Sequence, residues 1–246
     1  MILGIDTSLG TAVAVADLDG VVHAEAASAN PLGHAEVIGE LLEQALAAAA
    51  HGPIGATSAP APVTITHVAV GMGPGPFTGL RVGIAAARAF ALGRGLPVVP
   101  VPSHDAIALG LLLADALADP FDDADVADAA DVADDADPAA PASNVPLAVV
   151  TDARRREFAV SVYDGLDDDG LPHRIAGPLL TPRDQTDSVL APWGARREDA
   201  ASVPATMIAL LAARALAAGR TLTGSEPLYL RAPDVTLPAP RKKVGA

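Results

Sequence analysis

The stretch that decides the fold is Gly71-Met72-Gly73-Pro74-Gly75-Pro76-Phe77-Thr78-Gly79-Leu80-Arg81-Val82-Gly83. It follows a β-branched, apolar segment at 64–70, which predicts a buried strand, and it leads into a segment of helical period at 79–92. Glycines in such a connection permit positive φ and close approach of another group, and Pro74 and Pro76 stiffen the loop. Thr78 is placed to cap the helix, and free amides at the helix start suit an anion. A rigid crossover that binds no ligand explains the same residues equally well.

The helix predicted at 79–92 carries small residues at every fourth position, Gly79, Gly83 and Ala87. Apart from Arg81 and Arg88, the segment is apolar nearly all round. A helix of this kind needs cover beyond its own sheet. Either a neighbouring helix of the same chain or a second subunit supplies that cover.

The rest of the chain alternates strand and helix patterns, which predicts an α/β protein. Three N-terminal apolar runs, the second and third joined by the turn signal Asp19-Gly20, predict an antiparallel meander. Helices are predicted at 33–50, 103–117, with Ser103 as N-cap, and 203–218, with Pro204 at its start. The predicted strands are 2–5, 11–16, 21–27, 97–101, 146–151, 158–163 and, interrupted by turns, 171–180.

Composition narrows the possible functions. The chain has 246 residues and no cysteine, which excludes disulfides and thiolate metal sites. No apolar run reaches the roughly 20 residues that span a bilayer, and no leader pattern is present, so we expect a cytoplasmic protein without membrane contact. The formal net charge of −14 makes the chain a poor nucleic-acid binder by itself, because such binding depends on Lys and Arg meeting phosphates.

An acidic, low-complexity segment separates two parts of the chain. Residues 118–144 consist almost only of Asp, Ala, Val and Pro, and contain few large apolar groups to offset the entropy of ordering. We predict a disordered loop there; the alternative is a cation-binding Asp cluster, although no calcium-loop spacing is present. The predicted lobes are 1–117 and 145–246, the latter including a C-terminal tail.

Four segments, in this order and at fitting distances, resemble the TsaB family: Ile2–Ser8, Gly71–Gly83, Asp152-Ala153-Arg154-Arg155 and Pro227-Leu228-Tyr229-Leu230-Arg231. The resemblance implies a two-lobed actin/hexokinase-like (ASKHA) fold with a reduced second lobe. It implies a non-catalytic subunit that binds and activates a catalytic paralogue, TsaD, together with an ATPase, TsaE. It also implies a role in tRNA processing: synthesis of N6-threonylcarbamoyladenosine beside the anticodon, with tRNA reached only through the complex.

The residues themselves argue against catalysis by this chain. Members of the catalytic paralogue carry two metal-binding histidines four residues apart; here His104 is followed by Ala108, so no metal is expected. Asp6, Thr7 and Ser8 resemble a phosphate turn of the superfold, which we interpret as degenerate, with Asp6 stabilising the turn. The nearest second phosphate turn has Arg154 in place of glycine, and no Gly-Gly pair exists for an adenosine turn. We therefore predict no cofactor; the alternative is an ATP-dependent small-molecule kinase of the same fold.

Two sets of site residues follow. The glycine loop comprises Gly71, Gly73, Pro74, Gly75, Phe77 and Thr78. If the helices at 33–50 and 79–92 lie side by side, they form a partner-binding face in a dimer or a complex. We predict for it the residues Val37, Ile38, Leu41, Gly79, Arg81, Gly83, Ala87 and Arg88. The alternative is that both helices are covered within their own lobe, and the sequence leaves open whether the isolated chain is a homodimer.

Overall fold

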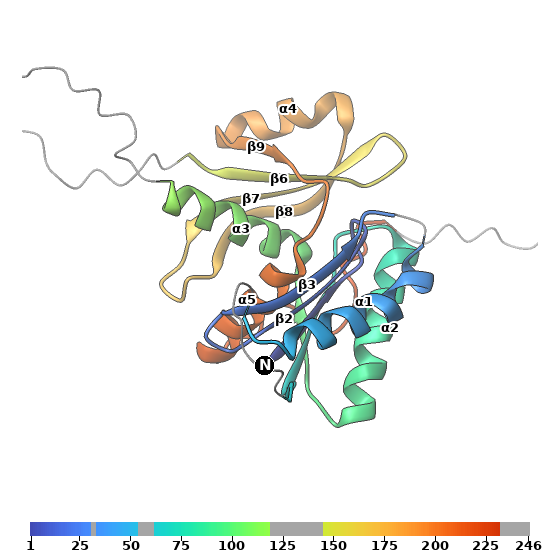
Figure 1. Ribbon diagram of the computed structural model, residues 1–246. Coiled ribbons are helices and arrows are strands. Elements are labelled where there is room, and N and C mark those ends of the chain that lie inside the picture. The colour runs from blue at the N-terminus through green and yellow to red at the C-terminus, as the bar shows by residue number, and fades with distance from the viewer. Residues whose placement is uncertain (31–32, 54–61, 119–144, 232–246) are drawn as a thin grey trace, which may run out of the picture.

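The computed structural model describes residues 1–30, 33–53, 62–118 and 145–231, and Figure 1 shows them as two stacked lobes. Each lobe is built around one β-sheet with helices on both faces. This confirms the predicted α/β fold of two lobes. The predicted disordered loop at 118–144 lies, except for its first residue, outside the described residues.

The first sheet has the strand order β3-β2-β1-β4-β5. Its strands are β1 (Ile2–Asp6), β2 (Thr11–Ala16), β3 (Val22–Ser28), β4 (His67–Gly71) and β5 (Val98–Val101). The first three form the predicted antiparallel meander, and β4 and β5 continue the sheet in parallel with β1. The end of β1 and the end of β4 therefore meet at one edge, where a strand-to-helix connection begins.

Alternating residues of β1 divide the core between two helix layers. Leu3 and Ile5 pack with α1 (His34–Ala49) and α2 (Phe77–Arg94), which lie side by side on one face. On the opposite face, Ile2 packs with α5 (Ala205–Ala217). A side chain at Gly4 has no room, because its Cβ would lie 2.5 Å from the carbonyl oxygen of Ala205.

The second sheet has the order β8-β7-β6-β9. Its strands are β6 (Leu147–Asp152), β7 (Glu157–Leu166), β8 (Pro172–Pro182) and β9 (Arg196–Asp199). The predicted pairing of the segments at 146–151 and 158–163 is confirmed, and β8 is one strand with bulges in its pairing. Helix α3 (Ser103–Leu117) packs on one face; the short α4 (Thr186–Leu190), between two 3₁₀ turns, packs on the other.

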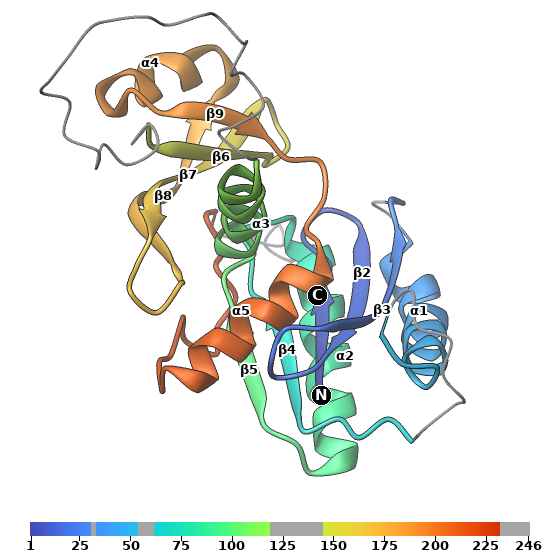
Figure 2. The same ribbon diagram turned by 60° about the vertical axis from the view of Figure 1, so that its left-hand side comes forward.

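The two lobes exchange helices, so their layers do not follow chain order. Helix α3 follows β5 in sequence but packs against the second sheet, whereas α5, from the predicted second lobe at 145–246, packs against the first. Figure 2 shows the two helices adjacent at the junction of the lobes. Their side chains join residues of both sheets in a single hydrophobic cluster that includes Ile2 and Leu147. The helical spacing of apolar residues in the sequence predicts both helices, but it does not show which sheet each helix packs against.

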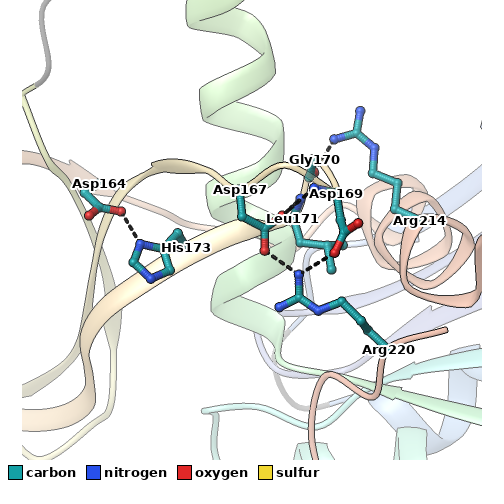
Figure 3. A network of polar contacts seen from close by, with 8 residues as sticks. All are labelled: Asp164, Asp167, Asp169, Gly170, Leu171, His173, Arg214 and Arg220. Atoms are coloured by element: carbon teal, nitrogen blue, oxygen red, sulfur yellow. Dashed lines mark hydrogen bonds and ion pairs between the residues drawn. The ribbon is translucent and has the colours of Figure 1, made fainter. Parts of the chain in front are cut away.

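A polar clamp adds a second tie between the lobes (Figure 3). The turn between β7 and β8 meets the end of α5, where Arg214 donates to the carbonyl oxygen of Gly170 at 2.5 Å. Arg220 contacts the carboxylates of Asp167 at 2.5 Å and Asp169 at 2.9 Å. Asp167 also organises the turn itself, because it accepts the N–H groups of Asp169 and Leu171. The second lobe is thereby fixed to a helix of the first.

Replacing Arg220 tests this clamp. We expect Arg220→Gln to speed amide hydrogen exchange at Asp169 and Leu171 with little change in Tm, because exposed ion pairs contribute little to global stability. The matched control is Arg196→Gln, which removes a similarly exposed arginine that pairs with Asp115 and Glu198 away from the turn. If amide exchange at both residues is unchanged in Arg220→Gln, the ion pairs of Arg220 do not stabilise the turn.

Candidate functional site

The carboxylate of Asp6 ends β1 and is buried. Its Oδ1 accepts the N–H of Ser8 at 2.6 Å, and its Oδ2 accepts the hydroxyls of Ser103 at 2.6 Å and Ser8 at 3.2 Å. Burial raises the pKa of Asp6 to about 6, while the hydrogen bonds from Ser103 and Ser8 act in the opposite direction. Asp6 thus stabilises the turn, as the sequence indicates, and both of its oxygens are engaged within the protein.

Ser103 links this turn to the glycine loop. It was expected to cap α3, but Pro102 occupies the N-cap position, and Ser103 is the first helical residue. Its hydroxyl instead donates to Asp6 and accepts the N–H of Gly73 at 3.0 Å, and its own N–H donates to the carbonyl of Gly73 at 2.8 Å. A Cβ at Gly71 would overlap Oδ2 of Asp6, so glycine is required there. A structural reason thus accounts for Gly71.

Thr7 docks into helix α2. Its hydroxyl donates to the carbonyl of Gly79 at 2.7 Å and accepts the N–H of Gly83 at 3.1 Å, two groups that are partners in a regular helical turn. A Cβ at Gly83 would overlap Oγ1 of Thr7. Gly79, Gly83 and Ala87 are all buried on this inner side. The prediction that a partner contacts this row is therefore corrected: the chain's own β1–β2 turn covers its N-terminal part.

The start of α2 also differs from the expected capping. Pro76 is the N-cap residue, Phe77 begins the helix, and no side chain of the described residues caps it. Thr78, the predicted cap, lies within the first turn and is exposed. Proline fits at the cap because it needs no hydrogen-bond partner for an N–H group.

The other residues predicted for a partner face divide into three groups. Ile38 and Leu41 are buried in the core between α1 and the first sheet, and Val37 packs against that core. These three are corrected to core positions, with only Val37 partly accessible. Arg81 and Arg88 are exposed on α2, but both contact a later part of the chain.

That later part is the segment before residue 232, which crosses back over the glycine loop. Leu228 donates its N–H to the carbonyl of Met72 at 2.8 Å, and the Tyr229 ring lies 4.7 Å from the Phe77 ring, centroid to centroid. The guanidinium of Arg81 lies 3.7 Å from the centroid of Phe77, and its Nε donates to the hydroxyl of Tyr229 at 3.1 Å. The sequence pattern at 227–231 does not predict this contact.

The turn between β6 and β7 has an unusual backbone. Arg154, Arg155 and Arg156 have φ values of 66°, 53° and 63°, in the left-handed region that costs about 1–2 kcal/mol for each non-glycine residue. Asp152 holds the turn by accepting the N–H of Arg154 at 2.8 Å and pairing with Arg183 at 2.8 Å. The turn therefore adopts a conformation that favours glycine, while displaying three exposed guanidinium-bearing side chains.

These elements enclose a cavity of about 350 Å³ between the lobes. One wall is the glycine loop from Pro74 to Phe77; the other is the second lobe, at 151–155, Ala159 and Leu180; and residues 229–231 complete the lining. A second cavity of about 240 Å³ lies at the Asp6 turn, beside residues 8–10. Arg154 lines both cavities.

His104, the only histidine near a family metal position, is completely buried in α3. Its Nδ1 lies 2.9 Å from Oγ of Ser161 and its Nε2 lies 2.8 Å from Oγ1 of Thr151. Burial, with a smaller effect of the Arg174 charge, lowers the pKa of His104 to about 3, so its ring is neutral. Among the described residues, no three His, Asp or Glu side chains are placed to share a metal ion.

The fold and this cleft between two lobes define a member of the actin-like fold class. Residues 12–129 match the family model described as TsaD: tRNA N6-adenosine threonylcarbamoyltransferase. Comparison with curated protein sequences gives no match. None of the helices described has the length and apolarity to cross a membrane.

Two solved structures share the fold across nearly the whole chain. YeaZ from Pseudomonas aeruginosa matches with a TM-score of 0.63 and 18% identity, covering 93% of this chain and 99% of the other. A protein described as uncharacterized, with similarity to peptidase YEAZ from Pseudomonas aeruginosa, matches with a TM-score of 0.61 and 19% identity, covering 94% and 99%. At 18% and 19% identity, these two matches show that the chain shares the fold of YeaZ.

The buried Asp6 carboxyl predicts a pH-dependent stability. Its folded pKa of about 6 exceeds the unfolded value of 3.8, so protonation favours the folded state, and stability is lost as pH rises through this window. We expect the free energy of unfolding of the wild type, relative to Asp6→Asn, to fall by up to about 3 kcal/mol between pH 4 and pH 7. Urea unfolding of both proteins across this range measures it. A difference that stays flat or rises with pH would refute the burial argument.

Proposed function

We propose that this chain is a non-catalytic subunit of the machinery that makes N6-threonylcarbamoyladenosine in tRNA, and that it binds and activates a catalytic TsaD-family paralogue. The TsaD-family domain at 12–129 and the structural similarity to YeaZ support a role in this modification. The finer role, as a partner-binding subunit, rests on two arguments. One is the outer surface of α2, and the other is that the sequence has neither a second metal-binding histidine nor a Gly-Gly adenosine turn.

The observation that carries this proposal is an apolar stripe on the outer face of α2. Ala85, Ala89 and Leu92 are exposed and Val82 is half-buried, at intervals of three, four and three residues. This spacing is typical of helices that pack against other helices. Leu92, 85% exposed, is the largest exposed side chain of this stripe. The stripe replaces the inner row of small residues as the proposed contact.

The dimensions of the helix pair suit a specific interface. Helix α2 has 18 residues and α1 has 16, so they are about 27 and 24 Å long at 1.5 Å per residue. A standard interface buries about 800 Å² on each partner. We propose that the outer sides of both helices meet the equivalent helices of the paralogue, and that the same face allows a homodimer when the chain is alone.

The remaining partners follow from charge and chemistry. A chain with a formal net charge of −14 gains little from tRNA phosphates, so the proposal assigns most of the tRNA contact to the catalytic subunit. An ATPase subunit of the TsaE type supplies the nucleotide hydrolysis that this cleft is not equipped to perform. The proposed location is the cytoplasm.

Substitution of Leu92 tests the partner face. We expect Leu92→Glu to weaken association with the catalytic TsaD-family subunit at least about tenfold, because a buried, unpaired carboxylate is costly in an interface. The control is Leu117→Glu, because Leu117 is 82% exposed at the far end of α3. Sedimentation velocity of each variant with the catalytic subunit measures the effect. Equal association of the two variants would remove α2 from the proposed interface.

The isolated chain is expected to show no catalytic turnover. Both oxygens of Asp6 are held by Ser8 and Ser103, and Ala108 stands where a second metal-binding histidine is needed. Purified protein with ATP, or with threonylcarbamoyl-adenylate and tRNA, should give rates at background. Turnover that disappears in Asp6→Ala would instead favour the alternative, an ATP-dependent small-molecule kinase.

A further inference from the structure

The larger cavity between the lobes has the properties of a ligand site rather than of a packing defect. Its volume of about 350 Å³ lies within the range of about 300–1,000 Å³ that is typical of small-molecule sites. Phe77, Tyr229, Leu180 and Ala159 line it with apolar surface. These side chains come from three separate parts of the chain, so an apolar body placed in the cavity is contacted from both lobes.

The charged groups at the cavity favour an anion. Arg154 and Arg155 line it with two exposed positive charges, and Arg154 also interacts electrostatically with Asp152. Asp152 is the one carboxylate among the described residues that line the cavity, and its Oδ1 pairs with Arg183 and accepts the N–H of Arg154. Arg231, which also lines the cavity, pairs with Glu157. In a chain with a formal net charge of −14, this is a local concentration of positive charge.

We propose that this cavity binds a small aromatic anion, such as an aryl phosphate or an aryl carboxylate. Its flat apolar body lies between the glycine loop and the second lobe, against the wall of Phe77, Tyr229 and Leu180. Its anionic group lies at Arg154 and Arg155, whose planar guanidinium groups match phosphate and carboxylate oxygens in pairs. Binding of this kind requires neither the catalytic subunit nor tRNA, so it is independent of the proposed partner role.

The experiment separates the two parts of the ligand. Isothermal titration calorimetry of the full chain uses three probes: 1-naphthyl phosphate, 1-naphthol, which has the same rings without the charge, and inorganic phosphate, which has the charge without the rings. We expect 1-naphthyl phosphate to bind at least about tenfold more tightly than either of the others, since both contributions are then present. Absence of saturable binding, or equal binding of inorganic phosphate, would overturn the proposal.

Neighbouring arginines of one turn give a matched pair of variants. Arg154→Gln should weaken 1-naphthyl phosphate binding about tenfold, because it removes a charged hydrogen-bond donor from the cavity. Arg156→Gln makes the same change in charge at a residue with nearly the same φ, but Arg156 does not line the cavity, so affinity should be unchanged. Equal weakening by the two variants would indicate general surface attraction, and would also overturn the proposal.

Discussion

The docking of one polar turn, Asp6 to Ser8, into the interior is the interaction on which the rest of the structure depends. Three consecutive polar side chains are buried there, and burial of such groups is tolerated only when they are hydrogen-bonded. Asp6 and Ser8 are bonded to Ser103 at the start of α3, and Thr7 is bonded to α2. The backbones must approach closely for these bonds to form, which is why glycines stand at the facing positions.

This arrangement, with the shared core, determines what the cleft between the lobes can do. A cluster containing Ile2 of the first sheet and Leu147 of the second is continuous through α3 and α5, and the contacts of Arg214 and Arg220 tie the same parts at the surface. Relative motion of the lobes would open a packed core, which is costly. The shared core therefore opposes a change in the separation of the two walls of the larger cavity. Such a cavity favours a ligand that fits its existing shape over one that requires the lobes to close around it.

Much of this architecture is predictable, because the spacing of hydrophobic residues indicates where strands and helices lie, and the spacing of glycines indicates where two backbones approach closely. These patterns do not indicate which residue or element packs against each segment. The row of Gly79, Gly83 and Ala87 correctly predicted a close approach, but the approaching group is Thr7 and not another subunit. Likewise, α5 was predicted as a helix but not as a layer of the first sheet. The left-handed turn at Arg154 was not predictable, because arginine does not favour that conformation.

The inner docking also decides which surface of α2 is available to a partner. Successive helical residues turn by about 100°, so a residue two positions after Gly83 points about 200° away from it. Because Thr7 fixes Gly83 inward, Ala85 and, one turn later, Ala89 are fixed outward. A polar contact in the interior thus orients an apolar stripe at the surface. Separate bonds of the same turn, from Ser8 and Ser103, hold both oxygens of the Asp6 carboxylate, so one buried turn both orients α2 and fixes this carboxylate.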